Sequence, residues 1–201
     1  MTRKFIENEL VFASHNKGKM KEVGEMFAGK GIKVYSTADF NLESPEETED
    51  NFLGNALIKA KYTAEKTGKP ALADDSGFCV EAIDGEPGVY SANWAETENG
   101  RDFDMAMNMV IDKMGESDNK NASFVTCLVL YWPDGHYEHV EGRVSGSIVW
   151  PPRGDAGFGY DPMFVPEGHT RTFAEMGSDE KNGISHRGRA FEMLMEKCFK
   201  K

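Results

Sequence analysis

The sequence predicts an α/β fold that forms one compact domain over residues 1–201. Three observations support this prediction. Short apolar runs alternate with segments of helical spacing, a Pro-Asp-Gly turn joins two β-rich segments, and 39% of the 201 residues are hydrophobic, which is enough for one core. No internal repeat, low-complexity tract or long linker divides the chain.

The predicted elements follow one another with short connections. In chain order they are strand Leu10–Ala13, helix Gly18–Phe27, strand Ile32–Tyr35, helix Phe52–Thr67, strand Ala71–Ala73, helix Arg101–Met114, β-rich segments Ser123–Trp132 and Tyr137–Trp150, and helix Arg189–Phe199. Gly68 is expected to end the helix that begins at Phe52. Asn55 and Lys59 share one face of that helix because they are four residues apart. Pro133-Asp134-Gly135 is typical of a hairpin turn.

Two adjacent carboxylates, Asp74 and Asp75, follow the apolar run Ala71–Ala73. In open α/β sheets, ligands bind beyond the carboxyl ends of strands, and aspartates there offer the hard oxygens that Mg²⁺ prefers. The alternative is a simple turn, since Asp-Asp-Ser-Gly suits one. On this segment alone, the turn is the better interpretation.

A second polar segment, Ser14–Lys19, lies between a predicted strand and a predicted helix. Amides at a helix N-terminus, together with the helix dipole, attract anions, and two lysines stand nearby. The spacing is not that of a P-loop. The alternative is that Ser14 or Asn16 is an ordinary helix cap and that the lysines are solvated.

Composition narrows the function classes. A formal net charge of −11 argues against a protein that wraps nucleic acid. The three cysteines lack metal-binding or disulfide spacing, and no apolar run is long enough to cross a bilayer or to serve as a signal peptide. We therefore expect a cytoplasmic protein, with no membrane partner, whose lysines form a local site for a small polyanion.

Three further segments belong to one pattern with the two polar segments above. They are Gly157–Phe164, Glu180–Ala190 and Pro87–Ala92. Together with Ser14–Lys19 and Asp74–Gly77, in this order and at these separations, the chain resembles the inosine triphosphate pyrophosphatase family, the non-canonical purine nucleoside triphosphate pyrophosphatases. The resemblance covers about residues 10–190.

The resemblance implies a long, twisted mixed sheet flanked by helices, with two lobes and an active-site cleft between them. It implies Mg²⁺-dependent hydrolysis of ITP, dITP and XTP to the nucleoside monophosphate and pyrophosphate, and a homodimer. Asp75 matches the catalytic carboxylate, which also binds metal, and Glu46 matches the second metal ligand. Glu47 and Asp74 are further candidates. For the acidic loop, which holds Glu43, Glu46, Glu47, Glu49 and Asp50, the alternative is a solvated charge run.

The substrate residues also follow from the resemblance. Those that match are Ser14, His15, Asn16, Lys17, Gly18 and Lys19 for the triphosphate, Lys59 and Ser76 for further contacts, Phe158, Gly159, Tyr160 and Asp161 for the nucleoside pocket, and Lys181, His186 and Arg187 for reading the base. An aromatic ring can stack on a base. Phe158 has a second interpretation as plain core, and Lys59 as a solvent-facing lysine.

Two positions depart from the family pattern. Gly54 stands where Glu is common, and Asn93 stands where Arg is common, which puts details of metal support and packing in doubt. Two rival functions remain open. One is a nucleotide pyrophosphatase with another base preference, which is expected to lack the Ser-His-Arg segment. The other is a non-catalytic nucleotide-binding module, which has no need for carboxylates near a triphosphate.

Overall fold

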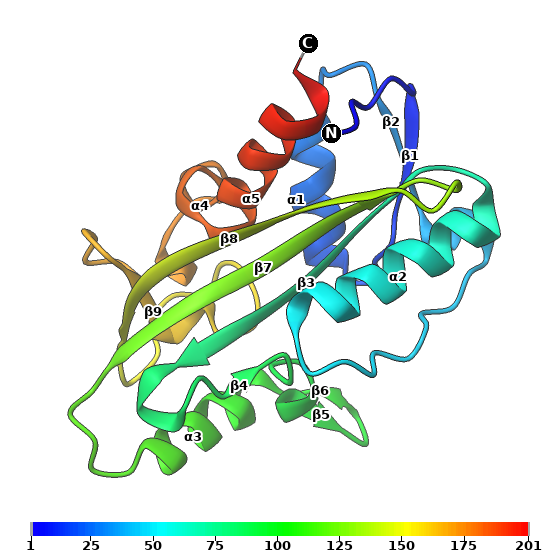
Figure 1. Cartoon of the computed structure of the whole chain (residues 1–201). Helices are drawn as coiled ribbons and strands as arrows, with labels where there is room; N and C mark the ends of the chain where they lie inside the picture. The colour runs from blue at the N-terminus through cyan, green and yellow to red at the C-terminus, as the bar shows by residue number, and fades with distance from the viewer. Residues whose placement is uncertain (1, 201) are drawn as a thin grey trace. The chain divides into compact units, whose positions relative to one another are not determined.

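The computed structural model describes residues 2–200 and contains a mixed sheet flanked by helices, as predicted (Figure 1). Within those residues, seven strands form the main sheet in the order β2-β1-β3-β7-β8-β9, with β4 paired to β3. Strand β1 is parallel to β2 and β3, whereas β9 is antiparallel to β8. The strands are β1 Glu9–Phe12, β2 Lys33–Ser36, β3 Ala71–Val80, β4 Pro87–Gly88, β7 Asn121–Tyr131, β8 Tyr137–Ile148 and β9 Phe164–Pro166, and a separate hairpin holds β5 Glu96–Thr97 and β6 Gly100–Arg101.

Four of the helices in the described residues lie close to their predicted positions, whereas α4 was not predicted. The helices are α1 Lys17–Phe27, α2 Phe52–Thr67, α3 Phe103–Met114, α4 Ser178–Ile184 and α5 His186–Leu194, the last continued by a π-helical turn, Met195–Phe199. Helix α2 begins where predicted, because the Asn51 side chain accepts a hydrogen bond from the Gly54 amide, and it ends at Gly68, whose φ of 66° is left-handed. The hairpin turn at Pro133-Asp134-Gly135 is also confirmed, with Gly135 at φ 92°.

The described residues divide into two compact units. The first unit contains 2–75, Thr126–Gly142 and 189–200, and the second contains Ser76–Val125 and Arg143–Gly188. Strands β3, β7 and β8 each contribute residues to both units. The prediction of a single domain, and that of a cleft between lobes, stay predictions.

The main correction concerns β3. The sequence predicted a strand that ends at Ala73 and turns at Asp-Asp-Ser-Gly, but β3 continues through this segment to Val80. The turn interpretation is therefore wrong. The reason lies downstream: Phe78 and Val80 are fully buried, so the apolar pattern resumes after the aspartates and keeps the chain extended. It is the neighbouring strand β1 that ends just before the aspartates, because its last pairs with β3 are Val11 with Ala71 and Phe12 with Leu72.

Side chains alternate between the two faces of the sheet in the first unit. Leu10, Phe12 and Leu72 face a cluster that includes Val23 of α1 and Leu194 of α5. Ala13, Ala71 and Ala73 face a second cluster that contains the alanines of α2, namely Ala56, Ala60 and Ala64. Helices α1 and α5 thus cover one face and α2 covers the other (Figure 1). This period of two follows from strand geometry.

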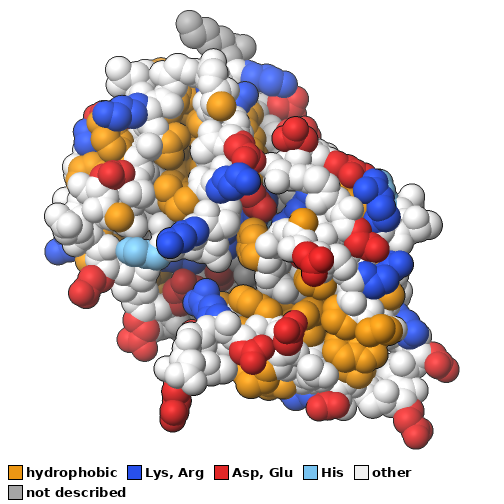
Figure 2. Space-filling view, turned by 180° about the vertical axis from the view of Figure 1, so that it is seen from behind, with side chains coloured by type: hydrophobic (Ala, Val, Ile, Leu, Met, Phe, Trp, Pro, Cys, Tyr) orange, Lys and Arg blue, Asp and Glu red, His pale blue; other side chains and the backbone are white. Residues whose placement is uncertain are grey.

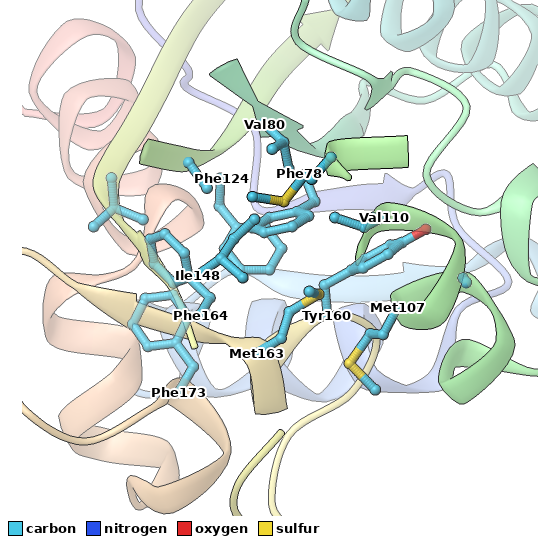
Figure 3. Packing of buried hydrophobic residues seen from close by; sticks show 14 of the residues in the cluster. Phe78, Val80, Met107, Val110, Phe124, Ile148, Tyr160, Met163, Phe164 and Phe173 are labelled. Carbon is cyan, nitrogen blue, oxygen red and sulfur yellow. The ribbon is translucent and has the colours of Figure 1, made fainter. Parts of the chain in front are cut away.

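The second unit has its own aromatic core (Figure 3). Phe78 of β3 stacks on Tyr160 with ring centroids 5.1 Å apart, and Phe124 of β7 meets Phe164 edge-on at 5.0 Å. Met107 and Met114 of α3 pack here, 2% and 9% exposed. These methionines are core residues, a common use of the flexible methionine side chain.

Candidate active site

The two adjacent aspartates point to opposite faces of the sheet. The Asp74 side chain lies on the same face of β3 as Leu72 and meets α1, where its Oδ2 lies 2.8 Å from the Lys19 ammonium nitrogen. The Asp75 side chain lies on the same face of β3 as Ala73 and meets α2, where its Oδ1 lies 3.7 Å from the Lys59 ammonium nitrogen. Strand alternation therefore separates two carboxylates that the sequence places side by side. They form two centres, and only one of them contains the predicted catalytic residue.

The centre at Asp75 is built by α2. The Asn55 amide donates to Asp75 Oδ2 at 3.3 Å, and Lys59, one helical turn later, contacts Asp75 Oδ1. Lys59 also binds Glu47 Oε1 of the acidic loop at 3.0 Å. Lys59 is 9% exposed, so the alternative of a solvent-facing lysine is wrong. Asn55 was not assigned a role from the sequence, although its spacing of four from Lys59 was a signal.

Burial sets the protonation of this centre. The pKa of Asp75 is raised above its usual value, mainly because burial disfavours the charged carboxylate, although Lys59 and Lys19 act in the opposite direction. The pKa of Lys59 is also raised: burial lowers it, but Asp75, Asp74 and Glu47 together outweigh that effect. The lysine thus stays protonated, while the aspartate becomes a stronger base than a solvated one.

The turn between β1 and α1 is a capped helix start. Asn16 Oδ1 accepts from the amides of Gly18 and Lys19 at 2.9 and 3.1 Å, so Asn16 is the helix cap that the alternative interpretation named. The Asn16 amide donates to Ser14 Oγ at 3.2 Å. Lys17 is exposed, whereas Lys19 is held against Asp74 and is not solvated. The role of Ser14–Lys19 as a phosphate-binding segment stays a prediction.

The acidic loop connects η1, Thr37–Phe40, to α2. The Glu49 amide donates to Asn55 Oδ1 at 3.0 Å, which brings the end of this loop to the residue that contacts Asp75. Gly54 makes this approach possible, because a Cβ there would lie 2.6 Å from the Glu49 Cβ. The departure from the family pattern at Gly54 therefore accompanies close packing of the loop. Glu46 is exposed, and Glu47 is the glutamate that meets Lys59.

The second unit holds a buried ion pair beside Phe158. Lys181 of α4 contacts Asp161 Oδ2 at 2.7 Å, and both side chains are nearly inaccessible, 6% and 3% exposed. The same carboxylate accepts from the Phe158 amide at 2.8 Å, and the Lys181 ammonium lies 4.6 Å from the Phe158 ring centroid. Gly157 leaves room for it, since a Cβ there would lie 2.1 Å from Asp161 Oδ2. Asp161 and Lys181 thus fix the segment that carries Phe158.

Three further predicted residues gather in the same unit. Arg187 is 1% exposed and its Nη2 donates to Ser76 Oγ at 3.3 Å. Its guanidinium carbon lies 5.9 Å from the Phe158 ring centroid. The His186 ring stacks on Phe124, with centroids 5.0 Å apart. Ser76, Phe158 and Arg187 are therefore brought together, whereas His186 packs against the core. Phe158 is half-buried and is absent from the aromatic core, which favours a ligand contact over plain core.

Tyr160 differs from its prediction. Its side chain is 2% exposed, and its hydroxyl donates to the Ser91 carbonyl at 2.8 Å. Burial raises the pKa of this phenol far above its usual value. The ring belongs to the core and braces the neighbouring Gly159, whose φ is 68°. The sequence could not separate Tyr160 from Phe158, because both flank the same glycine.

The two predicted metal ligands differ in burial, since Asp75 is buried and Glu46 is exposed. Within residues 2–200, no group of three or more His, Cys, Asp and Glu side chains is arranged to hold a metal ion. The oxygens of Asp75 and Glu47, however, converge on one cation, the Lys59 ammonium. Two hard carboxylate donors facing a common positive charge suit the chemistry of Mg²⁺, which takes few protein ligands beside its waters and substrate phosphates.

The fold and site thus define a mixed-sheet α/β protein with a buried lysine–carboxylate centre. Solved structures agree with this class: a HAM1 protein from Coxiella burnetii has a TM-score of 0.86 and 36% identity, covering 94% of this chain and 98% of its own. A Mycobacterium abscessus structure described as a nucleoside-triphosphatase and dITP/XTP pyrophosphatase has a TM-score of 0.74 and 37% identity, covering 92% and 97%.

Sequence comparison supplies the family. The Ham1 family model matches residues 10–197. A dITP/XTP pyrophosphatase of Ruegeria pomeroyi is 55% identical and covers 99% of both chains, and one of Gluconobacter oxydans is 53% identical over 95% of this chain and 91% of the relative. The chain belongs to the Ham1 family. Among the described residues, helices long and apolar enough for a membrane span are absent.

Proposed function

We propose that the chain is a nucleoside triphosphate pyrophosphohydrolase. Its substrates are the non-canonical purine nucleotides dITP, XTP and ITP, which it hydrolyses to the nucleoside monophosphate and pyrophosphate. The observation that carries the proposal is the buried centre in which Asn55 and Lys59 hold Asp75. Family membership supports the reaction class, and relatives named dITP/XTP pyrophosphatase support the substrates.

In this mechanism Asp75 orients a water molecule and takes its proton at a carboxylate oxygen. Burial, which raises the pKa of Asp75, makes the carboxylate a better proton acceptor near neutral pH. The ammonium groups of Lys59 and Lys19 offset the negative charge of the phosphates. Asn55 keeps Asp75 in a fixed orientation through its amide. The family assignment of Ser14–Lys19 to the triphosphate is part of the same proposal.

Mg²⁺ is the proposed cofactor. Asp75 and Glu46 are its predicted ligands, and Glu47 joins them because it faces the same cation as Asp75. When bound, Mg²⁺ supplies charge neutralisation at the phosphoryl oxygens and orientation of water. Lys59 contacts both Asp75 and Glu47, so its ammonium would share these two carboxylates with a bound ion.

Base recognition is proposed for the group around Phe158. The half-buried ring offers a stacking face, and Arg187 places a donor beside Ser76. Hypoxanthine and xanthine carry an acceptor at C6, whereas adenine carries a donor there. A donor from Arg187 or His186 would therefore be satisfied by the non-canonical bases and left without a partner by adenine.

The proposal extends to location and assembly. We propose that the enzyme acts on the nucleotide pool of the cytoplasm and forms a homodimer. Two exposed apolar side chains of the second unit support an interface, namely Tyr90 at 55% and Met105 at 37% exposure. Figure 2 shows a patch of apolar side chains gathered in the lower part of that view. Light scattering at several concentrations tests the dimer, and a mass of 22.4 kDa throughout contradicts it.

The experiment that tests the function is Asp75→Asn, assayed for pyrophosphate release from dITP with Mg²⁺. Loss of a general base lowers turnover by about 10²- to 10⁴-fold, and loss of a metal ligand adds to this effect. Binding of the nucleotide, measured by calorimetry, is expected to survive. A variant with near wild-type turnover at saturating Mg²⁺ contradicts the assignment of Asp75. If the unmutated protein releases pyrophosphate only from a pyrimidine or methylated nucleotide, the related pyrophosphatase is supported instead.

A further inference from the structure

The His15 side chain contacts the acidic loop and not the amides of the helix that follows it. Its Nε2 lies 2.9 Å from the Leu42 carbonyl oxygen, and its Nδ1 lies 2.7 Å from Ser44 Oγ. A carbonyl only accepts, so Nε2 carries the proton, and in the neutral ring Nδ1 accepts from the Ser44 hydroxyl. Both ring nitrogens are therefore used by the loop.

Thr37 adds contacts to both His15 and the preceding Ser14. Thr37 is 4% exposed, and its Oγ1 lies 3.3 Å from His15 Nε2 and 3.4 Å from the Ser14 carbonyl oxygen. Thr37 begins the 3₁₀ helix η1, which leads directly into the loop. The turn after β1 and the start of the loop are thereby joined at three polar contacts around one imidazole.

The loop from residue 41 to residue 51 has no strand or helix of its own, so side chains fix its position. Its end is held by Asn55, which accepts from the Glu49 amide, and its middle by Lys59, which binds Glu47. His15 is the corresponding anchor at its beginning. Asn55 and Lys59 also contact Asp75, so the position of the loop is coupled to the proposed catalytic carboxylate.

We propose that His15 is a positioning residue that clamps the acidic loop, and so places Glu46 and Glu47 for turnover. This inference rests on the proposed function for its effect on catalysis, but the clamp itself does not. It also changes the role expected for His15, from a substrate contact to a holder of the loop. Ser44, which the sequence did not single out, becomes its partner.

The loop offers a direct probe of the clamp, because Glu43, Glu46, Glu47 and Glu49 are sites for a glutamate-specific protease. Cleavage requires the loop to leave its position. His15→Ala is expected to raise the rate of cleavage at these sites by about 10-fold, Ser44→Ala by less, and the double variant no more than His15→Ala, since both changes remove one interaction. His15→Gln, whose amide keeps a donor and an acceptor, should restore part of the protection. His169→Ala, an exposed histidine of the second unit, is the matched control and should leave the rate unchanged.

Activity on dITP is then measured for the same variants. His15→Ala is expected to lower kcat/KM by about 10-fold and by a similar factor for every triphosphate, with partial rescue in His15→Gln. Unchanged cleavage in His15→Ala overturns the clamp. Faster cleavage with unchanged kcat/KM overturns the positioning role. If the unmutated protein releases no pyrophosphate, the proposed function fails, and the positioning role with it, while the protease result still decides the clamp.

Discussion

The buried pair of Asp161 and Lys181 gives the sharpest stability prediction. Asp161→Asn keeps the shape of the side chain but removes the countercharge of an ammonium group that is 6% exposed. The Phe158 amide and the Lys181 ammonium both donate to Asp161 Oδ2, so an amide oxygen at that position can still accept from both, and the change removes chiefly the negative charge. Breaking a buried pair on one side costs about 3–5 kcal/mol, and the Phe158 ring at 4.6 Å retains part of the stabilisation of the cation. We expect a loss of about 2–4 kcal/mol.

Urea unfolding of a small series measures this loss. Asp161→Asn combined with Lys181→Met removes both charges and should recover about 2 kcal/mol relative to Asp161→Asn alone. Glu180→Gln removes one partner of the exposed pair that Glu180 forms with Arg171 in the same unit, and should change the free energy of unfolding by less than about 1 kcal/mol. If Asp161→Asn costs no more than this control, the pair does not brace the Phe158 segment and the reasoning is refuted.

Three other substitutions test two proposed substrate contacts, Lys19 and Arg187, and one buried carboxylate, Glu138. Lys19→Ala removes the proposed charge-assisted phosphate contact and should lower kcat/KM by a similar factor, about 10- to 150-fold, for every base. A loss confined to some bases would move Lys19 to base recognition. Arg187→Ala should reduce the preference of the enzyme for dITP over dATP, measured as the ratio of the two kcat/KM values. An unchanged ratio in steady-state assays would mean that Arg187 does not read the base. Burial acts to raise the pKa of Glu138, but hydrogen bonds from the Arg3 amide, Lys197 and His136 outweigh it and lower this pKa to about 2. The ionised Glu138 therefore stabilises the fold fully above the pKa of the unfolded state, near 4.5, and this stabilisation is lost as the pH falls toward 2. Glu138→Gln should therefore destabilise the protein at about pH 7 but little at about pH 2, and an equal loss at both, by urea unfolding, would contradict this.

Much of the fold was predictable because local signals were strong. Helix α2 has an apolar stripe, an asparagine cap and a terminal glycine, and its observed bounds agree with the prediction. The end of β3 was missed because Asp-Asp-Ser-Gly has turn chemistry, and only the burial of Phe78 and Val80 keeps it extended. Turn propensity is a local preference that tertiary packing overrides.

The site was predictable in its residues but not in its pairings. The sequence shows two adjacent aspartates, but it does not show that strand alternation sends Asp74 to α1 and Asp75 to α2. Similarly, Tyr160 and Phe158 belong to one motif, yet only the packing shows that Tyr160 enters the core while Phe158 stays half-buried. Which partner a charged side chain meets depends on contacts between distant segments, and single-chain patterns do not carry that information.

The central claim concerns which bond is broken and for which base. The most direct measurement is product analysis by anion-exchange chromatography after incubation of the purified protein with Mg²⁺ and dITP, XTP, ITP, ATP or GTP. We expect nucleoside monophosphate and pyrophosphate in equal amounts, with kcat/KM for the three non-canonical nucleotides at least about 100-fold above those for ATP and GTP. Comparable kcat/KM values for ITP and ATP would contradict the account. So would nucleoside diphosphate and orthophosphate as the products.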